Sequence, residues 1–453
     1  MSKKISFTDL NKTVEDLLYK NLDKITIGDI CFYKLIQHGI VFYEKRSQQK
    51  LIQHYFKINS FTYFFFLFFK NLFTNGKNIK INLKKVLLFD SDRIVNVNNE
   101  DRSQCFYKIK TLLRKNKVEF SYFTKDRGDF SINNLKKDWK YKLFPTYEVI
   151  KLHYYCRKLI NNLGQLGWDA ELIDYISSSL HIFIEEFRFY NNLFSLNIQI
   201  EKILLITHYH QEGLIYAAKK KSINILELQH GLISKNDLYY VYTKELNDYV
   251  SKSLFCDSIF VFGNYWKKIL EFGSEYNGRI YCVGDYKTDE KSSFSIKKEN
   301  IILITSQKTM HNEYIKYVLN LSKTINYSKW RILVKLHPSE PMKEKYDTLK
   351  KVKNVEIVDN LTLNECFMKS KIHISIYSTT LYDAINYDVI NLSLQNYSVY
   401  NDYASEIIKS EIALPINFDD NPLKFKMQNN QRELLFYYDY FNENKALNHI
   451  NLN

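Results

Sequence analysis

Residues that interrupt regular backbone structure are scarce in this chain. Its 453 residues include 12 glycines and 5 prolines, whereas average usage of the two together is about 12%. Each glycine or proline that remains is therefore more informative, because it is more often kept for a backbone need.

Several sequence signatures are also missing. The six cysteines are scattered without a CxxC pair, which argues against a zinc ribbon or a disulfide framework and favours a reducing cytosol. Neither GxxxxGK[ST] nor GxGxxG occurs, so P-loop and dinucleotide-binding proteins are excluded. The first ten residues lack the apolar core of a signal peptide, and the apolar run 61–69 is about half of a membrane span. We expect a cytoplasmic protein.

The bulk composition is that of a folded, basic protein. Hydrophobic residues make up 45% and charged residues 25%, close to globular averages, and the length suits two or three domains. Lys and Arg number 64 against 50 Asp and Glu, a net charge of +14. Such a charge suits an anionic partner, which could be nucleic acid, an acidic membrane surface or a phosphorylated substrate.

Hydrophobic patterning divides the chain into three regions. Residues 1–80 have mixed three- and four-residue apolar spacing, which predicts helices. In 81–284, short apolar runs alternate with helical stretches, including a long helical insertion at 146–199. The polar stretch 284–300 predicts a linker, and 285–453 repeats the strand–helix alternation and ends in a helix. This order predicts two Rossmann-type α/β domains with parallel sheets that face a central cleft.

The second predicted domain places polar side chains directly after its strands. Thr305 and Ser306 follow the run 301–305, His337 and Pro338 follow 331–336, and Ser378–Thr380 follow 373–376. The carboxyl ends of parallel strands share one edge of a sheet. We expect the hydroxyls and first amides of a helix that begins near 380 to bind phosphate there, with His337 beside them.

The first domain offers candidate bases at the equivalent edge. His210 and Glu212 follow the strand 203–207, and the triplet Gln229–Gly231 follows 223–228. His230 or Glu212 could deprotonate an acceptor hydroxyl. The pair Asp90 and Asp92 follows the run 86–89, but two carboxylates without a third ligand make a weak metal site, and we expect no metal or other cofactor.

Three motifs together resemble a known enzyme group. The segments ELQHG, VKLHPSE and SIYSTTLYDA are similar to those of bacterial GT-B glycosyltransferases that build capsules, teichoic acids and lipopolysaccharide. The resemblance covers about 200–395 and is nearest to the CDP-glycerol glycerophosphotransferase group and the capsule sialyl- and Kdo-transferase groups.

The resemblance implies a function and a division of roles. It implies an inverting, metal-independent glycosyltransferase that moves a sugar or polyol phosphate from a nucleotide-activated, preferably cytidine-type, donor to a hydroxyl of a growing surface polysaccharide. Donor phosphate would be bound by Thr305, Ser306, His337, Pro338, Ser378, Thr379, Thr380 and Asp383. His210, Gln229 and Gly231 would lie on the acceptor side, with His230 or Glu212 as the base.

Partners and alternatives follow from the same features. We expect a nucleotide-sugar donor, a glycan or lipid-linked glycan acceptor, and peripheral contact with the anionic cytoplasmic face of the inner membrane through the first 80 residues and the run 61–69. One alternative is a nucleotide-sugar epimerase of the same fold, since architecture does not determine the reaction. A basic nucleic-acid-binding protein is the other, but neither a zinc-finger nor an RRM signature occurs.

Overall fold

A computed structural model describes residues 18–37, 40 and most of 82–450. Outside this description lie residues 1–17, 38, 39, 41–81, 91–93, 98, 99, 104, 125–129, 133–146, 236, 238, 243–251, 275, 277, 288–296, 308, 309, 327, 338, 339, 341, 342, 359, 360, 396–406, 427–436 and 451–453. The apolar run 61–69 and Pro338 are therefore among the predictions that the description does not reach.

The first domain is built on a seven-stranded parallel sheet in the order β11-β10-β9-β8-β3-β6-β7. Numbered along the chain, this order is 7-6-5-4-1-2-3, so the sheet reverses between β3 and β8. The central strands are fully buried, as expected of strands covered by helices on both faces. Their bounds are β3 (Val86–Phe89), β6 (Phe120–Thr124), β7 (Phe130–Ser131), β8 (Lys202–Ile206), β9 (Asn224–Leu228), β10 (Ser258–Val261) and β11 (Ile280–Cys282).

The second domain has a six-stranded parallel sheet in the order β14-β13-β12-β15-β16-β17. Along the chain this order is 3-2-1-4-5-6, the Rossmann order, and the sheet reverses between β12 and β15. The strands are β12 (Ile301–Thr305), β13 (Arg331–Lys335), β14 (Val355–Val358), β15 (Ile372–Ser375), β16 (Ile390–Leu394) and β17 (Leu414–Ile416). The predicted fold class of two Rossmann-type α/β domains is confirmed.

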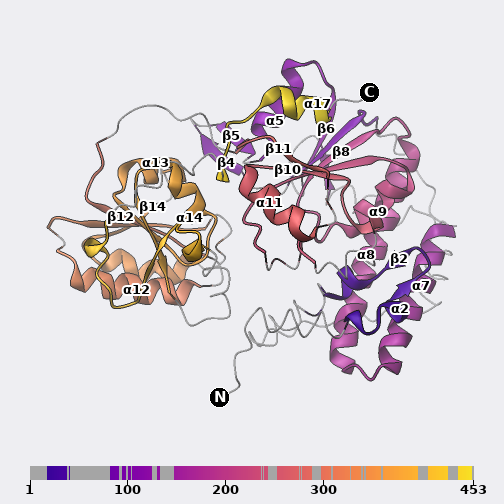
Figure 1. Cartoon of the computed structure of the whole chain (residues 1–453), viewed down its shortest axis with the longest axis horizontal. Coiled ribbons are helices and arrows are strands. Elements are labelled where there is room, and N and C mark those ends of the chain that lie inside the picture. Colours follow the sequence, from indigo (N-terminus) through magenta and orange to yellow (C-terminus); the bar gives the residue numbers. More distant parts are fainter. Residues whose placement is uncertain are drawn as a thin grey trace.

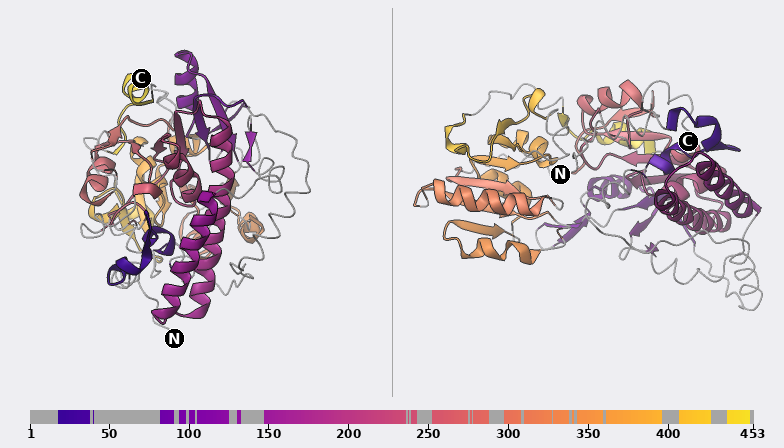
Figure 2. Two further views of the ribbon diagram at one scale, coloured as in Figure 1. Left: turned by 90° about the vertical axis from the view of Figure 1, so that its right-hand side faces the viewer. Right: turned by 90° about the horizontal axis from the view of Figure 1, so that it is seen from below.

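Helices cover the sheets (Figure 1). Those of the first domain are α5 (Tyr107–Lys115), α7 (Tyr147–Gln165), α8 (Ala170–Leu196), α9 (Glu212–Lys220) and α11 (Asn264–Gly273); those of the second are α12 (His311–Thr324), α13 (Leu363–Lys369) and α14 (Thr380–Asp383). The predicted helical insertion 146–199 consists of two helices, α7 and α8, which lie side by side (Figure 2). Helix α8 packs closely on α9 because Gly213 has no side chain; a Cβ there would lie 2.4 Å from Cβ of Glu186.

The N-terminal region is not purely helical, which corrects the prediction for 1–80 in its described part. After the short helix α2 (Leu22–Ile25), strands β1 (Thr26–Ile27) and β2 (Ile30–Cys31) form an antiparallel hairpin. Gly28 lies in its turn at φ +65, a conformation that favours glycine. Among the described residues no helix is long and apolar enough to cross a membrane.

The last described segment returns to the first domain, although we had assigned all of 285–453 to the second. Helix α17 (Glu443–Ile450) packs beside α5 (Figure 1), and Glu443 pairs with Lys115 at 2.8 Å. The backbone amides of Asp439 and Asn442 donate to Phe262 and Val283, so the segment runs alongside the end of β11. The first domain is thus made of two separate stretches of chain.

Candidate active site at the facing strand ends

A chain of buried hydrogen bonds at the carboxyl end of the second sheet determines where several hydroxyl protons lie. The Asn391 Nδ2 amide donates to two carbonyls, so its Oδ1 accepts from His373 Nδ1 at 2.7 Å. Burial lowers the pKa of His373 to about 4, so the ring is neutral at pH 7 and its Nε2 accepts from Thr305 Oγ1 at 2.9 Å. Thr305 Oγ1 in turn accepts from Thr380 Oγ1 at 2.8 Å.

This chain corrects two predicted phosphate ligands. The hydroxyl protons of Thr305 and Thr380 are both used inside the protein, so neither is available to a phosphate oxygen. The two threonines instead tie the end of β12 to the start of α14. Ser378 and Thr379 are half-buried, and their binding of donor phosphate stays a prediction.

The helix that follows this turn begins at Thr380, as predicted, but it is short. Helix α14 has four residues, and a 3-10 turn, Ala384–Asn386, continues it. One turn sums few peptide dipoles, so the helix start contributes little to anion binding. Positive charge to bind an anion at this edge would therefore come from side chains. The half-buried His337 is the side chain that we predict for this role.

His337 is joined to the end of β12 through its backbone. Its amide donates to Ser306 Oγ at 2.9 Å, and the Ser306 amide donates to Lys335 O. Ser306 is 3% exposed, and its hydroxyl holds the turn that carries His337 in place. Of the two residues, His337 is the one placed to meet a ligand.

The strand ends of the two domains meet at one point. A Cβ built on Gly231 would lie 3.7 Å from Thr379 Cγ2, so the turn after β9 lies next to the turn after β15. Gln229 shapes the first turn: its Nε2 donates to Gly231 O at 2.9 Å and its Oε1 accepts from Phe262 N at 3.0 Å. Gln229 is fully buried, so it positions His230 rather than contacting an acceptor.

Of the two proposed bases, the structure places only His230 beside this contact. Its Nε2 lies 3.1 Å from the Tyr209 hydroxyl. Glu212 is 5% exposed; its Oε1 accepts from the His210 amide at 3.1 Å and lies 3.7 Å from the buried Lys34 Nζ. Glu212 is therefore an internal ion-pair partner in this structure, and its role as the base stays a prediction. His210 itself is exposed in a turn at φ +64.

Asp383 also has a structural partner. Its Oδ1 accepts a hydrogen bond of 2.8 Å from Tyr438, a residue of the segment that returns to the first domain. Burial raises the pKa of Asp383. The neighbouring Tyr382 packs against Trp266 of α11, with ring centroids 5.0 Å apart. Asp383 therefore joins the domains instead of binding donor phosphate.

Sequence reasoning missed a buried network below the His230 turn. The Glu227 carboxylate accepts from the amide and Nδ1 of His208, at 3.1 and 2.8 Å, and from the hydroxyls of Tyr240 and Tyr276, at 2.6 and 2.5 Å. His208 Nε2 faces Tyr239 O at 2.7 Å. Both ring nitrogens thus face acceptors, which the imidazolium form satisfies. The sequence signal for this network is Glu227 itself, a charged residue inside the otherwise largely apolar run 223–228.

The charge on Glu227 follows from these partners. Burial alone would raise its pKa, but the charge of His208 and the hydrogen bonds from His208, Tyr240 and Tyr276 hold the pKa at about 2. The network anchors the loop that carries Tyr209, because Tyr209 and Tyr239 pack with ring centroids 4.5 Å apart. Glu227 thereby helps to position Tyr209, whose hydroxyl lies beside the His230 ring.

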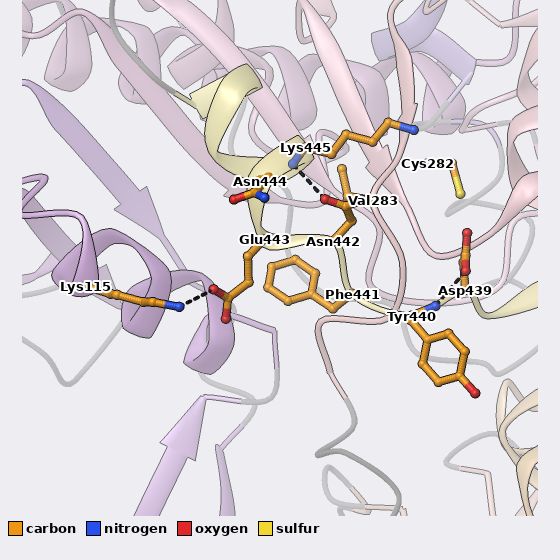
Figure 3. A pocket seen from close by; sticks show the side chains of 10 residues that line it. All are labelled: Lys115, Cys282, Val283, Asp439, Tyr440, Phe441, Asn442, Glu443, Asn444 and Lys445. Atoms are coloured by element: carbon orange, nitrogen blue, oxygen red, sulfur yellow. Dashed lines mark hydrogen bonds and ion pairs between the residues drawn. The ribbon is translucent and has the colours of Figure 1, made fainter.

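Two other features lie apart from this contact. A hollow of about 590 Å³ is lined by residues 439–445 with Lys115, Cys282 and Val283 (Figure 3); it includes none of the predicted site residues.

Within the described part of the chain, no three His, Cys, Asp or Glu side chains are grouped to hold a metal. Asp90 accepts from Tyr122 at 2.5 Å, and Asp92 lies outside the description.

No protein-family model and no curated protein matches the chain. Solved structures resemble it at low identity. MnaA of S. aureus in complex with UDP shares 13% identity, covering 81% of this chain and 96% of that one, with a TM-score of 0.47. The UDP-GlcNAc 2-epimerase of Methanocaldococcus jannaschii shares 12% (81% and 99%, TM-score 0.46), and a glycosyltransferase of kitacinnamycin 9% (76% and 89%, TM-score 0.42).

Proposed function

We propose that the protein is a glycosyltransferase that moves a sugar or polyol phosphate from a nucleotide-activated donor to a hydroxyl of a surface polysaccharide. The observation that carries this proposal is the position of Gly231 next to Thr379, close enough that a Cβ on Gly231 would be in van der Waals contact with it. It joins the turns after β9 and β15, near the points where the strand order of each sheet reverses, and such points are where doubly wound sheets bind ligands. A donor held by one domain can there meet an acceptor held by the other.

The residues would divide the reaction as follows. His230 takes the proton of the acceptor hydroxyl, whose oxygen bonds to the transferred group as the bond to the nucleotide phosphate breaks. His337 and the hydroxyls of Ser378 and Thr379 stabilise the negative charge that the departing nucleotide gains. Tyr209 orients the His230 ring. A cytidine donor and independence from metal remain predictions from the motif resemblance.

Ligand binding is the first test. A thermal-shift panel of CMP, CDP, UDP and GDP should show stabilisation by at least one nucleotide, because a ligand at ten to a hundred times its dissociation constant stabilises by about 1.4 to 2.7 kcal/mol. The variant Ser378→Ala should weaken the response, whereas Ser328→Ala, at an exposed loop position of the same domain, should not. A flat panel would count against the proposal.

Turnover is the second test. His337→Ala should lower kcat with the true donor by about 10²- to 10³-fold, the loss seen when one preorganised charge-stabilising donor is removed. Product analysis with and without acceptor glycan separates transfer from epimerisation, because an epimerase converts its nucleotide sugar without an acceptor. Unchanged turnover in His337→Ala would refute the role of this residue.

We also propose peripheral association with the inner membrane. The net charge of +14 favours an anionic lipid surface, where each basic residue near the surface contributes about 1 kcal/mol. The protein should sediment with vesicles that contain anionic lipid and dissociate in high salt. Equal binding to neutral vesicles would contradict the electrostatic part.

A further inference from the structure

The chain that leaves the first domain carries a lysine whose ammonium group has no oxygen partner among the described residues. Lys287 follows β11 by five residues, within the predicted linker 284–300, and is half-buried. Its Nζ lies 4.5 Å from the ring centroid of Phe262, a cation–π contact. No carbonyl, hydroxyl or carboxylate of the described residues pairs with this Nζ. Its three N–H donors are therefore available to a ligand.

Hydrogen bonds place Lys287 next to the turn that carries His230. The hydroxyl of the preceding residue, Tyr286, donates to Gln229 O at 2.6 Å. The amide of Phe262, over whose ring the ammonium lies, donates to Gln229 Oε1 at 3.0 Å. The residue before Lys287 and the ring beneath its ammonium are thus both bonded to the residue before His230.

On its other side, Lys287 is close to the turn after β15 of the second domain. Burial raises the pKa of Asp383, and the positive charge of Lys287 opposes that rise, so the ammonium lies near this carboxylate. The Asp383 amide donates to Thr379 O at 3.0 Å, which puts Asp383 one helical turn after Thr379. Lys287 is therefore close to both turns that lie next to each other at Gly231 and Thr379.

The two carboxylates near Lys287 have other partners. Asp383 Oδ1 accepts from the Tyr438 hydroxyl at 2.8 Å. Asp285 Oδ1 accepts from the backbone amide of Lys287 itself, also at 2.8 Å. Neither carboxylate forms an ion pair with the Lys287 ammonium in the described part of the chain. The positive charge of Lys287 is thus not neutralised by direct contact and remains available to an anion.

We propose that Lys287 binds the phosphate of the donor nucleotide, with its ammonium donating to phosphate oxygens. The inference rests on the proposed function for the class of ligand, a nucleotide. At this edge the hydroxyl protons of Thr305 and Thr380 are used inside the protein, and His337 is charged only when it is protonated. Lys287 supplies a positive charge that persists at neutral pH, from a segment that belongs to neither sheet.

Calorimetric titration tests the assignment. The nucleotide that stabilises the protein most in the thermal-shift panel is titrated into the wild type, Lys287→Gln and Lys287→Arg. Lys287→Gln should bind about 10-fold more weakly, as expected for loss of a hydrogen bond from a charged group. Lys287→Arg keeps the charge and should bind within about 3-fold of the wild type. Raising the salt from about 50 to about 300 mM should weaken the wild type more than Lys287→Gln, because the variant has lost a charge contact.

Controls separate phosphate binding from net charge and from folding. Lys297→Gln, at an exposed position near the other end of the linker, removes the same charge and should bind the nucleotide as the wild type does. Without ligand, Lys287→Gln should melt within about 4 °C of the wild type, because its ammonium contributes only a cation–π contact to the fold.

Each other outcome overturns a defined part of the reasoning. If Lys287→Gln binds the nucleotide as tightly as the wild type, or more weakly but with the same salt dependence, Lys287 does not contact the phosphate while the proposed function stands. If Lys297→Gln weakens binding as much as Lys287→Gln, the effect is one of net charge and the assignment is wrong. If no nucleotide binds to the wild type, both the inference and the proposed function fail.

Discussion

Replacing Glu227 by glutamine should destabilise the first domain strongly at neutral pH. The substitution keeps the size of the side chain but removes the charge that His208, Tyr240 and Tyr276 surround. It leaves the His208 ring buried against a neutral amide. Breaking a buried charge pair from one side typically costs about 3 to 5 kcal/mol.

The pKa of Glu227 gives an independent magnitude. It is about 2 in the folded protein against an ordinary value of 4.5, and a difference of about 2.5 pKa units corresponds to about 3 kcal/mol at neutral pH. Because the folded pKa is the lower one, this stability is present above the unfolded pKa and is lost as the pH falls towards the folded pKa. At pH 3.5 about 1.4 kcal/mol of it is gone.

Urea unfolding followed by fluorescence at several pH values measures both effects. The difference in unfolding free energy between wild type and Glu227→Gln should be about 3 kcal/mol at pH 7 and should shrink as the pH falls to 3.5. The matched control is Glu119→Gln, whose side chain is 74% exposed in a surface ion pair and which should change stability by less than about 1 kcal/mol. Equal midpoints for wild type and Glu227→Gln at pH 7, or a difference independent of pH, would refute the reasoning.

Three further predictions, which use four variants, probe other contacts. Tyr209→Phe removes the hydroxyl beside the proposed base and should lower kcat about 10-fold and shift the acidic limb of its pH profile; an unchanged profile would argue against the orienting role. In urea melts, Gly213→Ala should lose about 2 kcal/mol through overpacking of α8 on α9, whereas Gly164→Ala, which meets open space in α7, should gain up to about 1 kcal/mol; equal effects would contradict the packing argument. Tyr438→Phe should lose about 1 to 3 kcal/mol by leaving the half-buried Asp383 without this donor, measured as a lower thermal midpoint, and no change would show that the bond does not hold the domains.

Strands buried on both faces were the easiest elements to predict. The runs 86–89 and 301–305 match β3 and β12 residue for residue, because such strands are continuously apolar. Strands β7, β11 and β17 were missed; they have two or three residues each, too few to show a period. The hairpin at 26–31 was missed because its two-residue strands lie among apolar residues with helical spacing.

Site residues were predicted by position but not by role. Strand ends placed Thr305, Thr380 and Asp383 correctly at one edge, yet their functions depend on which group each one bonds to. Those partners, His373 and Tyr438 among them, come from distant parts of the sequence.

The return of residues 437–450 to the first domain has a consequence for synthesis on the ribosome. The segment that completes the packing beside β11 and α5 emerges only after the whole second domain has been made. The first domain therefore stays open along that side throughout translation, while the second, whose strands all lie between 301 and 416, can fold as soon as it leaves the exit tunnel. In topology the second domain is an insertion within the first.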